Sequence, residues 1–341
     1  MAAVSDRADA GPAPCPVLRF ADFSPRRAES PDHRADEPVG AATRLLLMPP
    51  NSKVRTMTAA SSEPILAMSR ARVFVDASVG QVRLDHAEGV AVHADGSVWC
   101  GGEAGQVYRI PPEGGSLEER VGGGEGFTLA LAFGPGGNLY YVDLGRRAVM
   151  RLDPTAGGPE LFVESPIGGH DLVLPNAIAF DAAGRLYLTE SHSPTEPGPG
   201  VFRIDPDGSG ELWSPGPFLF ANGVAVAPDQ SAVYVAETWS RRVTRVPLLA
   251  DGAAGEPELV AELPGTLPDG LAFGPDGLLY VACYQPSQVV RIDEDGTPRV
   301  LIRDDDAIVL AHPTNIAFRD STAFCANLGR WHITAIELDS A

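Results

Sequence analysis

A phrase of about a dozen residues recurs six times along this chain and restricts the folds open to it. Each copy has an alternating apolar stretch, a turn rich in Gly, Asp and Pro, and, in most copies, a closing aromatic residue. The copies begin at Glu88, Leu129, Asn176, Asn222, Asp269 and Thr314, so successive starts are 41 to 47 residues apart. Such a period, with two strands and a turn per copy, is typical of a β-propeller blade. The sequence therefore predicts an all-β, six-bladed β-propeller.

The repeat also sets the domain organisation. It accounts for residues 66–341, with about 46 residues per blade, which is room for four short strands. We expect one closed domain over that range. Residues 1–65 are rich in Ala, Pro, Arg and Asp and lack helical or strand periodicity. Such a segment buries too little apolar surface to offset its ordering entropy, so we expect a disordered N-terminal extension.

The last blade lacks one strand. After the sixth copy only residues 333–338 remain as strand-like sequence, and an incomplete blade would leave an open edge. The segment RVFVDASV, residues 72–79, has strand character but no partner nearby in the sequence. We predict that residues 73–76 form an N-terminal strand that closes the last blade.

Arginine recurs at one position of the third strand of five blades. These residues are Arg109, Arg151, Arg203, Arg245 and Arg291. We expect a solvated or salt-bridged face there and not an anion site. Cys100, Cys283 and Cys325 occupy equivalent second-strand positions without metal-ligand spacing, which indicates small buried thiols.

The net charge of −19 restricts the partners. Such a chain repels phosphate backbones and anionic lipid, so we expect neither nucleic acid nor a membrane surface as a partner. No apolar run approaches the roughly 20 residues of a membrane helix, and the first residues lack a signal peptide. A cytoplasmic location is the resulting expectation; the sequence leaves the oligomeric state open.

The first residue of each copy marks one structural level on the innermost strands. Because these strands surround the propeller axis, their first residues should converge there. Four of the six carry side-chain oxygens suited to a metal: Glu88, Asn176, Asn222 and Asp269. No Lys or Arg shares the level, and buried carboxylates are costly without a cation. All-oxygen ligation favours Ca²⁺, with Mg²⁺, Mn²⁺ or Zn²⁺ as alternatives, and water or substrate would complete the shell.

Loops at the same face supply candidate substrate contacts. They are His170, Asp143, His192, Trp239 and Tyr284. Imidazole transfers protons near neutral pH, which makes the two histidines of interest. Trp239 and Tyr284 are expected to form an apolar wall, which suits a lactone or an aryl ester better than a polar sugar.

Four motifs occur in order at blade spacing: AEGVAV with Glu88, LPNAIAF with Asn176, ANGVAV with Asn222 and LPDGLAF with Asp269, followed by VACY. Through them residues 70–341 resemble the senescence marker protein/gluconolactonase family, which includes regucalcin, and more distantly diisopropyl fluorophosphatase. The resemblance implies a divalent metal held by a Glu, an Asp and one or two Asn, with the Asp also acting as acid/base or nucleophile. Sugar lactonases of this family carry Arg where this chain has Leu174, so the reaction class is a firmer expectation than gluconolactone itself.

We therefore expect a metal-dependent lactonase or esterase-type hydrolase (EC 3.1.1.-) acting on a small-molecule lactone or ester. The metal would polarise the carbonyl, and Asp269 would activate water or attack directly. No serine elbow, zinc-protease helix or phosphate-binding loop is present. Two alternatives stay open. Residues 221–246 also resemble strictosidine-synthase-like propellers, whose chemistry is metal-independent, and a propeller can serve as a non-enzymatic binding module.

Overall fold

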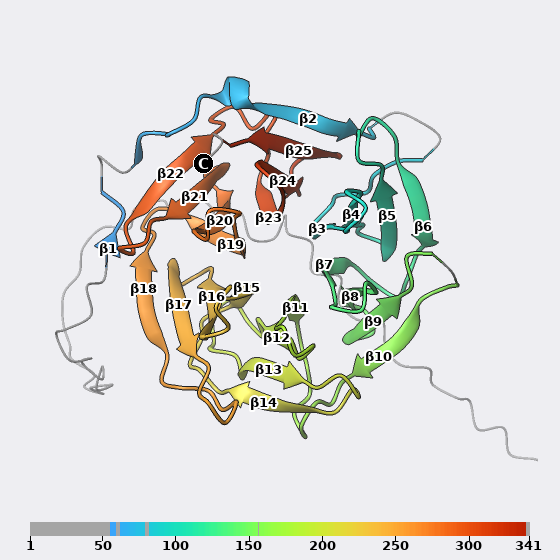
Figure 1. The fold of residues 1–341 in the computed structure, drawn as a ribbon, viewed down its shortest axis with the longest axis vertical. Helices are drawn as coiled ribbons and strands as arrows, with labels where there is room; N and C mark the ends of the chain where they lie inside the picture. The colour runs from blue at the N-terminus through green and yellow to red at the C-terminus, as the bar shows by residue number, and fades with distance from the viewer. Residues whose placement is uncertain (1–54, 59–61, 79–81, 156, 339–341) are drawn as a thin grey trace, which may run out of the picture. The chain divides into compact units, whose positions relative to one another are not determined.

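Six antiparallel sheets surround a central axis in the computed structural model of this chain (Figure 1). The structure describes residues 55–58, 62–78, 82–155 and 157–338. Each sheet has four strands that follow one another outward from the axis, and one sheet gains a fifth short strand at its outer edge. The predicted all-β, six-bladed propeller is confirmed. The described residues contain no helix with the length and apolar character needed to cross a membrane.

The strands follow the sequence repeat. The innermost strands are β3 (Val90–Val92), β7 (Thr128–Phe133), β11 (Pro175–Phe180), β15 (Ala221–Val226), β19 (Leu267–Phe273) and β23 (Pro313–Arg319). The second strands are β4 (Val98–Gly101), β8 (Leu139–Asp143), β12 (Leu186–Glu190), β16 (Ala232–Glu237), β20 (Leu279–Gln285) and β24 (Thr322–Asn327). The third strands are β5 (Gln106–Ile110), β9 (Ala148–Leu152), β13 (Gly200–Ile204), β17 (Arg242–Pro247), β21 (Gln288–Ile292) and β25 (His332–Glu337). The outer strands are β6 (Glu118–Gly122), β10 (Glu160–Glu164), β14 (Gly210–Ser214), β18 (Glu258–Glu262), β22 (Pro298–Arg303) and β2 (Ala71–Asp76).

Apolar residues of the second and third strands fill the space between neighbouring blades. Trp99 and Tyr187 are fully buried there, and the Tyr187 ring packs edge-on against Trp213 with ring centroids 5.0 Å apart. Cys100, Cys283 and Cys325 are free, buried thiols, as expected. Burial of this kind supplies the main stabilising free energy of a propeller, because each blade covers the apolar face of the next.

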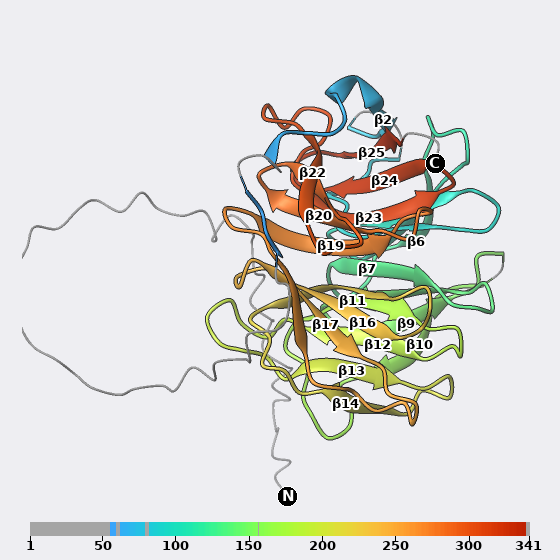
Figure 2. The same ribbon diagram turned by 60° about the vertical axis from the view of Figure 1, so that its left-hand side comes forward.

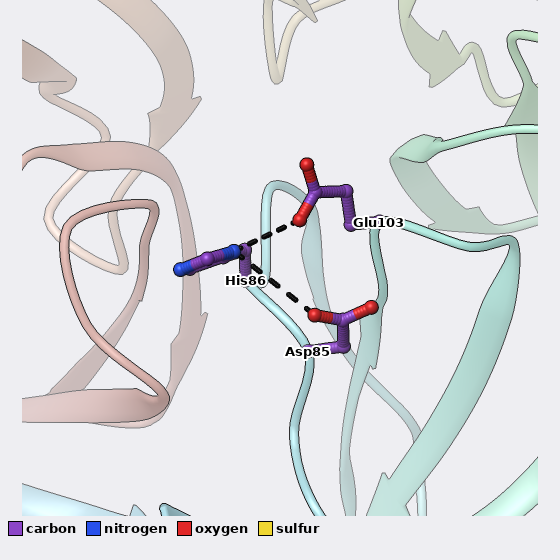
Figure 3. A group of neighbouring side chains, drawn as sticks. All are labelled: Asp85, His86 and Glu103. Carbon is purple, nitrogen blue, oxygen red and sulfur yellow. Dashed lines mark hydrogen bonds and ion pairs between the residues drawn. The ribbon is translucent and has the colours of Figure 1, made fainter. Parts of the chain in front are cut away.

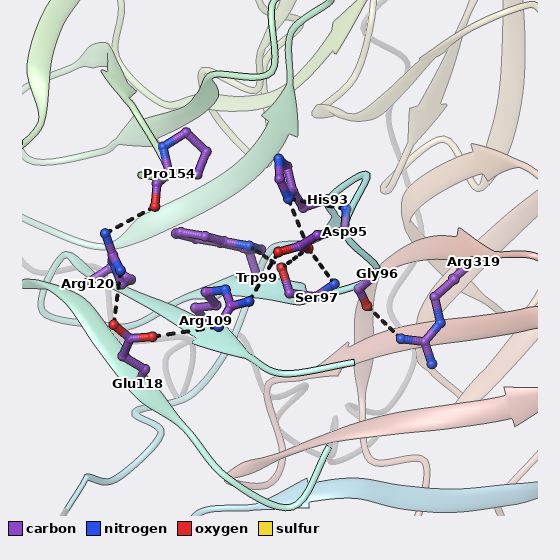
Figure 4. A network of polar contacts seen from close by, with 10 residues as sticks. All are labelled: His93, Asp95, Gly96, Ser97, Trp99, Arg109, Glu118, Arg120, Pro154 and Arg319. Atoms are coloured by element: carbon purple, nitrogen blue, oxygen red, sulfur yellow. Dashed lines mark hydrogen bonds and ion pairs between the residues drawn. The ribbon is translucent and has the colours of Figure 1, made fainter. Parts of the chain in front are cut away.

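The recurring arginines form ion pairs at the edge of this core. Figure 4 shows the first of them, Arg109, whose guanidinium lies 3.1 Å from the Asp95 carboxylate. Asp95 also accepts the backbone N–H of Ser97 and so fixes the turn between β3 and β4. The other four arginines each pair with Asp or Glu of the same blade. The predicted salt-bridged face is confirmed.

The N-terminal strand β2 closes the last blade. It pairs antiparallel with β25, with Val73 opposite Thr334, and lies beside β25 in both Figure 1 and Figure 2. The prediction that residues 73–76 provide this strand is confirmed. Closure of this kind removes an exposed sheet edge from the sixth blade.

Residues just before β2 cross the outer strands of two further blades. The short strand β1 (Arg55–Thr56) pairs in parallel with β18, and the Leu66 N–H donates to the Leu301 carbonyl of β22. A 3-10 turn, η3 (Met68–Arg70), then leads into β2. The predicted disordered extension, residues 1–65, extends too far, because the described residues between 55 and 65 bond to the propeller. Residues 1–54 lie outside the described part of the chain.

This course of the chain predicts that residues 55–66 stabilise the propeller. A protein lacking residues 1–66 should have a lower Tm than one lacking residues 1–50, because Leu66 is only 7% exposed and packs in the core. Burial of one leucine contributes about 2 kcal/mol. Differential scanning calorimetry measures the difference, and Leu66→Ala in the longer protein isolates the side chain. Equal Tm values for the two truncated proteins would contradict the prediction.

Candidate metal centre

Asn176, Asn222 and Asp269 each lie in a break of the strand ladder at the start of an inner strand. The pairing of β11 with β12 shifts register between Pro175 and Ile178, and equivalent shifts occur around Asn222 and Asp269. A β-bulge leaves a residue unpaired and turns its side chain. The three side chains can therefore point to the axis instead of alternating regularly with their neighbours. Glu88 occupies the equivalent place two residues before β3.

Close packing of the inner strands holds these positions at one level. A Cβ atom at Gly223, which follows Asn222, would lie 2.4 Å from the Asp269 carbonyl oxygen. Gly89, which follows Glu88, stands equally close to the backbone of the second blade. Only glycine allows such an approach. The Thr314 hydroxyl donates to the Glu88 carbonyl over 2.7 Å and joins the sixth blade to the first.

Two hydroxyl groups fix the direction of the asparagine side chains. Asn176 donates its amide N–H to Ser191 Oγ over 3.0 Å, and Asn222 donates to Thr238 Oγ1 over 3.1 Å. Each hydroxyl donates its own proton to a backbone carbonyl of the next blade, so it can only accept from the amide. The amide nitrogens are thereby turned towards the loops. The amide oxygens face the other way, and Asn222 Oδ1 is buried without a hydrogen-bond partner.

The two carboxylates at this level are buried without a salt-bridge partner in the described part of the chain. Glu88 is 2% exposed and Asp269 is 4% exposed. Glu88 Oε2 and Asp269 Oδ1 have no hydrogen-bond partner. Burial raises the pKa of both groups; the charge of Glu88 raises the pKa of Asp269 further, and the Asn222 amide opposes this rise. No salt bridge in the described part of the chain includes either residue.

These observations test whether a divalent cation fits the residues. Three buried oxygens, from Glu88, Asn222 and Asp269, lack partners, and two of them belong to carboxylates that raise each other's energy. A buried polar atom without a partner costs about 1–3 kcal/mol, and a buried charge costs more. An all-oxygen donor set of carboxylates and amides is the one that hard divalent cations prefer. The donor set fits such a cation.

Tyr284 lies beside this centre. Burial raises the pKa of its phenol, and the charges of Glu88 and Asp269 add to the effect. Its ring stacks on His312, with centroids 4.8 Å apart and an interplanar angle of 26°. His312 belongs to the loop before β23 and not to the end of a second strand, so the sequence repeat does not predict its position.

Trp239 directly follows Thr238, the residue that holds Asn222. Its ring is half-buried and packs edge-on against Phe220 with centroids 6.2 Å apart. The indole N–H of Trp239 is buried without a partner. Of the two predicted wall residues, Tyr284 is thus the one whose electrostatics link it to Glu88 and Asp269.

The Asp143 carboxylate stabilises loop backbone in this fold. It ends β8, is 3% exposed, and accepts the backbone N–H groups of Arg146 and Glu125. Glu190 and Glu237 end the equivalent strands and hold backbone N–H groups in the same manner. The ends of the second strands therefore anchor the loops around the centre, one residue before the side chains that hold the asparagines.

The two histidines of the predicted rim are less closely tied to the centre. His192 is half-buried in a left-handed conformation, with φ of 59°, and its backbone N–H donates to Glu190. His170 is exposed on the loop between β10 and β11 and packs edge-on against Phe202. No contact among the described residues joins either imidazole to the four proposed metal ligands.

A second polar group precedes Glu88 in the chain (Figure 3). His86 Nδ1 lies 2.9 Å from Glu103 Oε2 and 4.0 Å from Asp85 Oδ1. The imidazole also stacks on Trp331, with centroids 5.1 Å apart. These side chains pair with one another, whereas the buried oxygens of the centre have no partner. Glu103, the partner closest to His86 in space, is 17 residues away along the chain, so the sequence repeat does not predict this pair.

Known proteins with similar sequences include several lactonases. The chain is 26% identical to the 6-deoxy-6-sulfogluconolactonase of Pseudomonas putida over 64% of its length and 74% of that protein. It is 30% identical to the pentonolactonase of Haloferax volcanii, over 62% of this chain and 70% of the other. Its 31% identity to lactonase drp35 of Staphylococcus saprophyticus covers 43% of this chain and about half, 49%, of that protein.

Solved structures share the fold. A gluconolactonase from Xanthomonas campestris superimposes with a TM-score of 0.65 at 22% identity, covering 79% of this chain and 89% of the other. A streptogramin B lyase gives a TM-score of 0.56 at 16% identity, over 79% and 97% of the two chains. Residues 130–324, more than half of the chain, match the family described as SMP-30/Gluconolactonase/LRE-like region. The chain belongs to the SMP-30/gluconolactonase/LRE-like family.

Proposed function

We propose that this protein is a divalent-cation-dependent hydrolase of lactones or related esters, with Ca²⁺ as the cation. The observation that carries the proposal is the set of buried, unpartnered oxygens of Glu88, Asn222 and Asp269. The names of the similar proteins, which include a gluconolactonase-type enzyme and a pentonolactonase, support the reaction class.

Four residues would hold the cation: Glu88, Asn176, Asn222 and Asp269. When bound, such a cation acts as a Lewis acid on the substrate carbonyl. Ser191 and Thr238 keep the asparagine oxygens directed to the centre, so no reorientation of these amides is needed when substrate binds. The Asp269 carboxylate either takes a proton from the attacking water or attacks the carbonyl carbon itself. Its burial at 4% exposure limits competing contacts with solvent.

The buried carboxylates give less support to the two alternative functions. A strictosidine-synthase-like propeller works without metal catalysis, and a binding platform needs no reactive centre. Neither alternative accounts for two buried carboxylates whose pKa values are raised by burial, with the pKa of Asp269 raised further by the charge of Glu88. In a metal-dependent hydrolase both carboxylates would hold the cation.

Cation binding should stabilise the protein measurably. Ca²⁺ added to chelator-treated protein should raise the Tm in a saturable way, by an amount equivalent to about 2.7 kcal/mol when its concentration is 100 times Kd. Glu88→Gln should raise the Tm of the metal-free protein, because one of two repelling carboxylates is removed, and should weaken the response to Ca²⁺. The exposed Glu164→Gln is the matched control and should respond like the parent protein. An unchanged Ca²⁺ response in Glu88→Gln would argue against the ligand set.

The stability of the metal-free protein should also fall as pH rises. A carboxyl group with a raised pKa in the folded state binds its proton more tightly there than in the unfolded chain. The stabilisation is therefore complete at acidic pH and is lost as pH rises through the folded-state pKa. We expect the Tm to decrease between about pH 5 and about pH 8, and less steeply in Glu88→Gln. Saturating Ca²⁺ should remove most of this slope; identical slopes in all three samples would contradict the assignment.

Asp269→Asn tests the chemistry. The amide keeps the size of the side chain but can neither accept a proton nor attack the carbonyl, so kcat on lactones should fall at least about 100-fold. Initial rates are measured on a panel of lactones and esters with and without chelator. Full metal-dependent turnover in Asp269→Asn would exclude the proposed role of this carboxylate. Activity that survives complete chelation would instead favour the metal-independent alternative.

A further inference from the structure

We propose that the substrate is a lactone or ester whose remainder is a hydrocarbon chain and not a polyhydroxylated sugar chain. The inference rests on the proposed function and adds the substrate class. It comes from the side chains that share the level of the metal centre but do not ligate.

In the second blade, leucines occupy the two positions that hold the amide and the hydroxyl group in the third blade. The pairing of Thr128 with Asp143 in this blade corresponds to the pairing of Pro175 with Glu190 in the third blade. Leu129 therefore stands where the third blade has Asn176, and Leu144 stands where it has Ser191. The amide–hydroxyl pair of the third and fourth blades has become a leucine pair in the second.

Further apolar residues lie next to these leucines and on the following loop. Leu129 is 4% exposed, and the half-buried Leu144 and Phe127 pack against its cluster. The Leu144 N–H donates to the Phe127 carbonyl, which joins the two loops that carry these side chains. On the next loop Val173 is 43% exposed and Leu174 is half-buried, and the Glu190 carboxylate holds both backbone N–H groups. This leucine sector, formed by Leu129, Leu144, Phe127, Val173 and Leu174, faces solvent in part.

The two hydroxyl groups that hold the asparagines, and the Glu190 carboxylate, are already engaged. The hydroxyl protons of Ser191 and Thr238 go to backbone carbonyls, and Glu190 is occupied by backbone N–H groups. The Tyr284 phenol lies close enough to Glu88 and Asp269 for their charges to raise its pKa, and Trp239 directly follows Thr238 in the chain. A buried substrate hydroxyl without a partner costs about 1–3 kcal/mol, so a sugar chain would bind poorly. A hydrocarbon chain instead gains about 0.8 kcal/mol for each CH₂ group that it buries.

The test compares substrates with one ring and different substituents. γ-Butyrolactone, γ-nonanolactone and a pentono-1,4-lactone share the five-membered lactone ring. For the Ca²⁺-loaded protein, kcat/KM should be at least about tenfold higher for γ-nonanolactone than for the pentonolactone. Leu144→Ala should lower kcat/KM for γ-nonanolactone about tenfold and leave that for γ-butyrolactone nearly unchanged. Leu161→Ala, at an exposed leucine of β10, is the control and should change neither value.

A binding measurement keeps the result independent of turnover. The five-membered lactam with a pentyl substituent should bind more tightly than unsubstituted 2-pyrrolidinone in calorimetry, and Leu144→Ala should remove most of the difference. The Ca²⁺-induced rise in Tm of Leu144→Ala shows that its centre is intact. Efficient hydrolysis of γ-butyrolactone without any preference for the alkyl chain would overturn the substrate class and leave the proposed function standing. Absence of turnover on every lactone and ester would overturn the proposed function itself.

Discussion

Burial of two carboxylates at one level is the constraint on which the centre of this propeller depends. Glu88 and Asp269 come from the first and fifth blades, are almost fully buried, and have no positively charged partner in the described part of the chain. Their burial is unfavourable unless the groups are protonated or a cation joins them. The proposed cation site follows from this conflict. A buried salt bridge would have satisfied the same carboxylates and left no reason for a metal.

The fold supplies this arrangement through backbone features more than through side-chain packing. Bulges turn Asn176, Asn222 and Asp269 out of the regular alternation of their strands. Gly89 and Gly223 allow neighbouring inner strands to approach within a distance that a Cβ atom would prevent. The ring of blades that brings these strands together is completed at the sixth blade by strand β2, which pairs with β25.

Much of the architecture could be predicted because it repeats. Six copies of one phrase gave the blade number, the inner strands and the shared level of the four candidate ligands, and the missing strand of the last copy gave β2. The role of Asp143 could not be predicted from the repeat. An acidic loop residue near a site suggests substrate binding, but its carboxylate holds backbone N–H groups of two loops. His312 stacks on Tyr284 through a contact between residues 28 positions apart, for which the repeat offers no pattern.

The sequence by itself determined the propeller, its closure and the set of oxygen-bearing residues at one level, because periodic patterns encode periodic structure. Only the tertiary structure decided which atoms of that set lack partners. The direction of the asparagine amides depends on Ser191 and Thr238, whose protons are committed to carbonyls of another blade. The elevated pKa values of Glu88 and Asp269 likewise depend on burial and on proximity across distant segments. Such effects arise from three-dimensional neighbours, which a linear pattern does not specify.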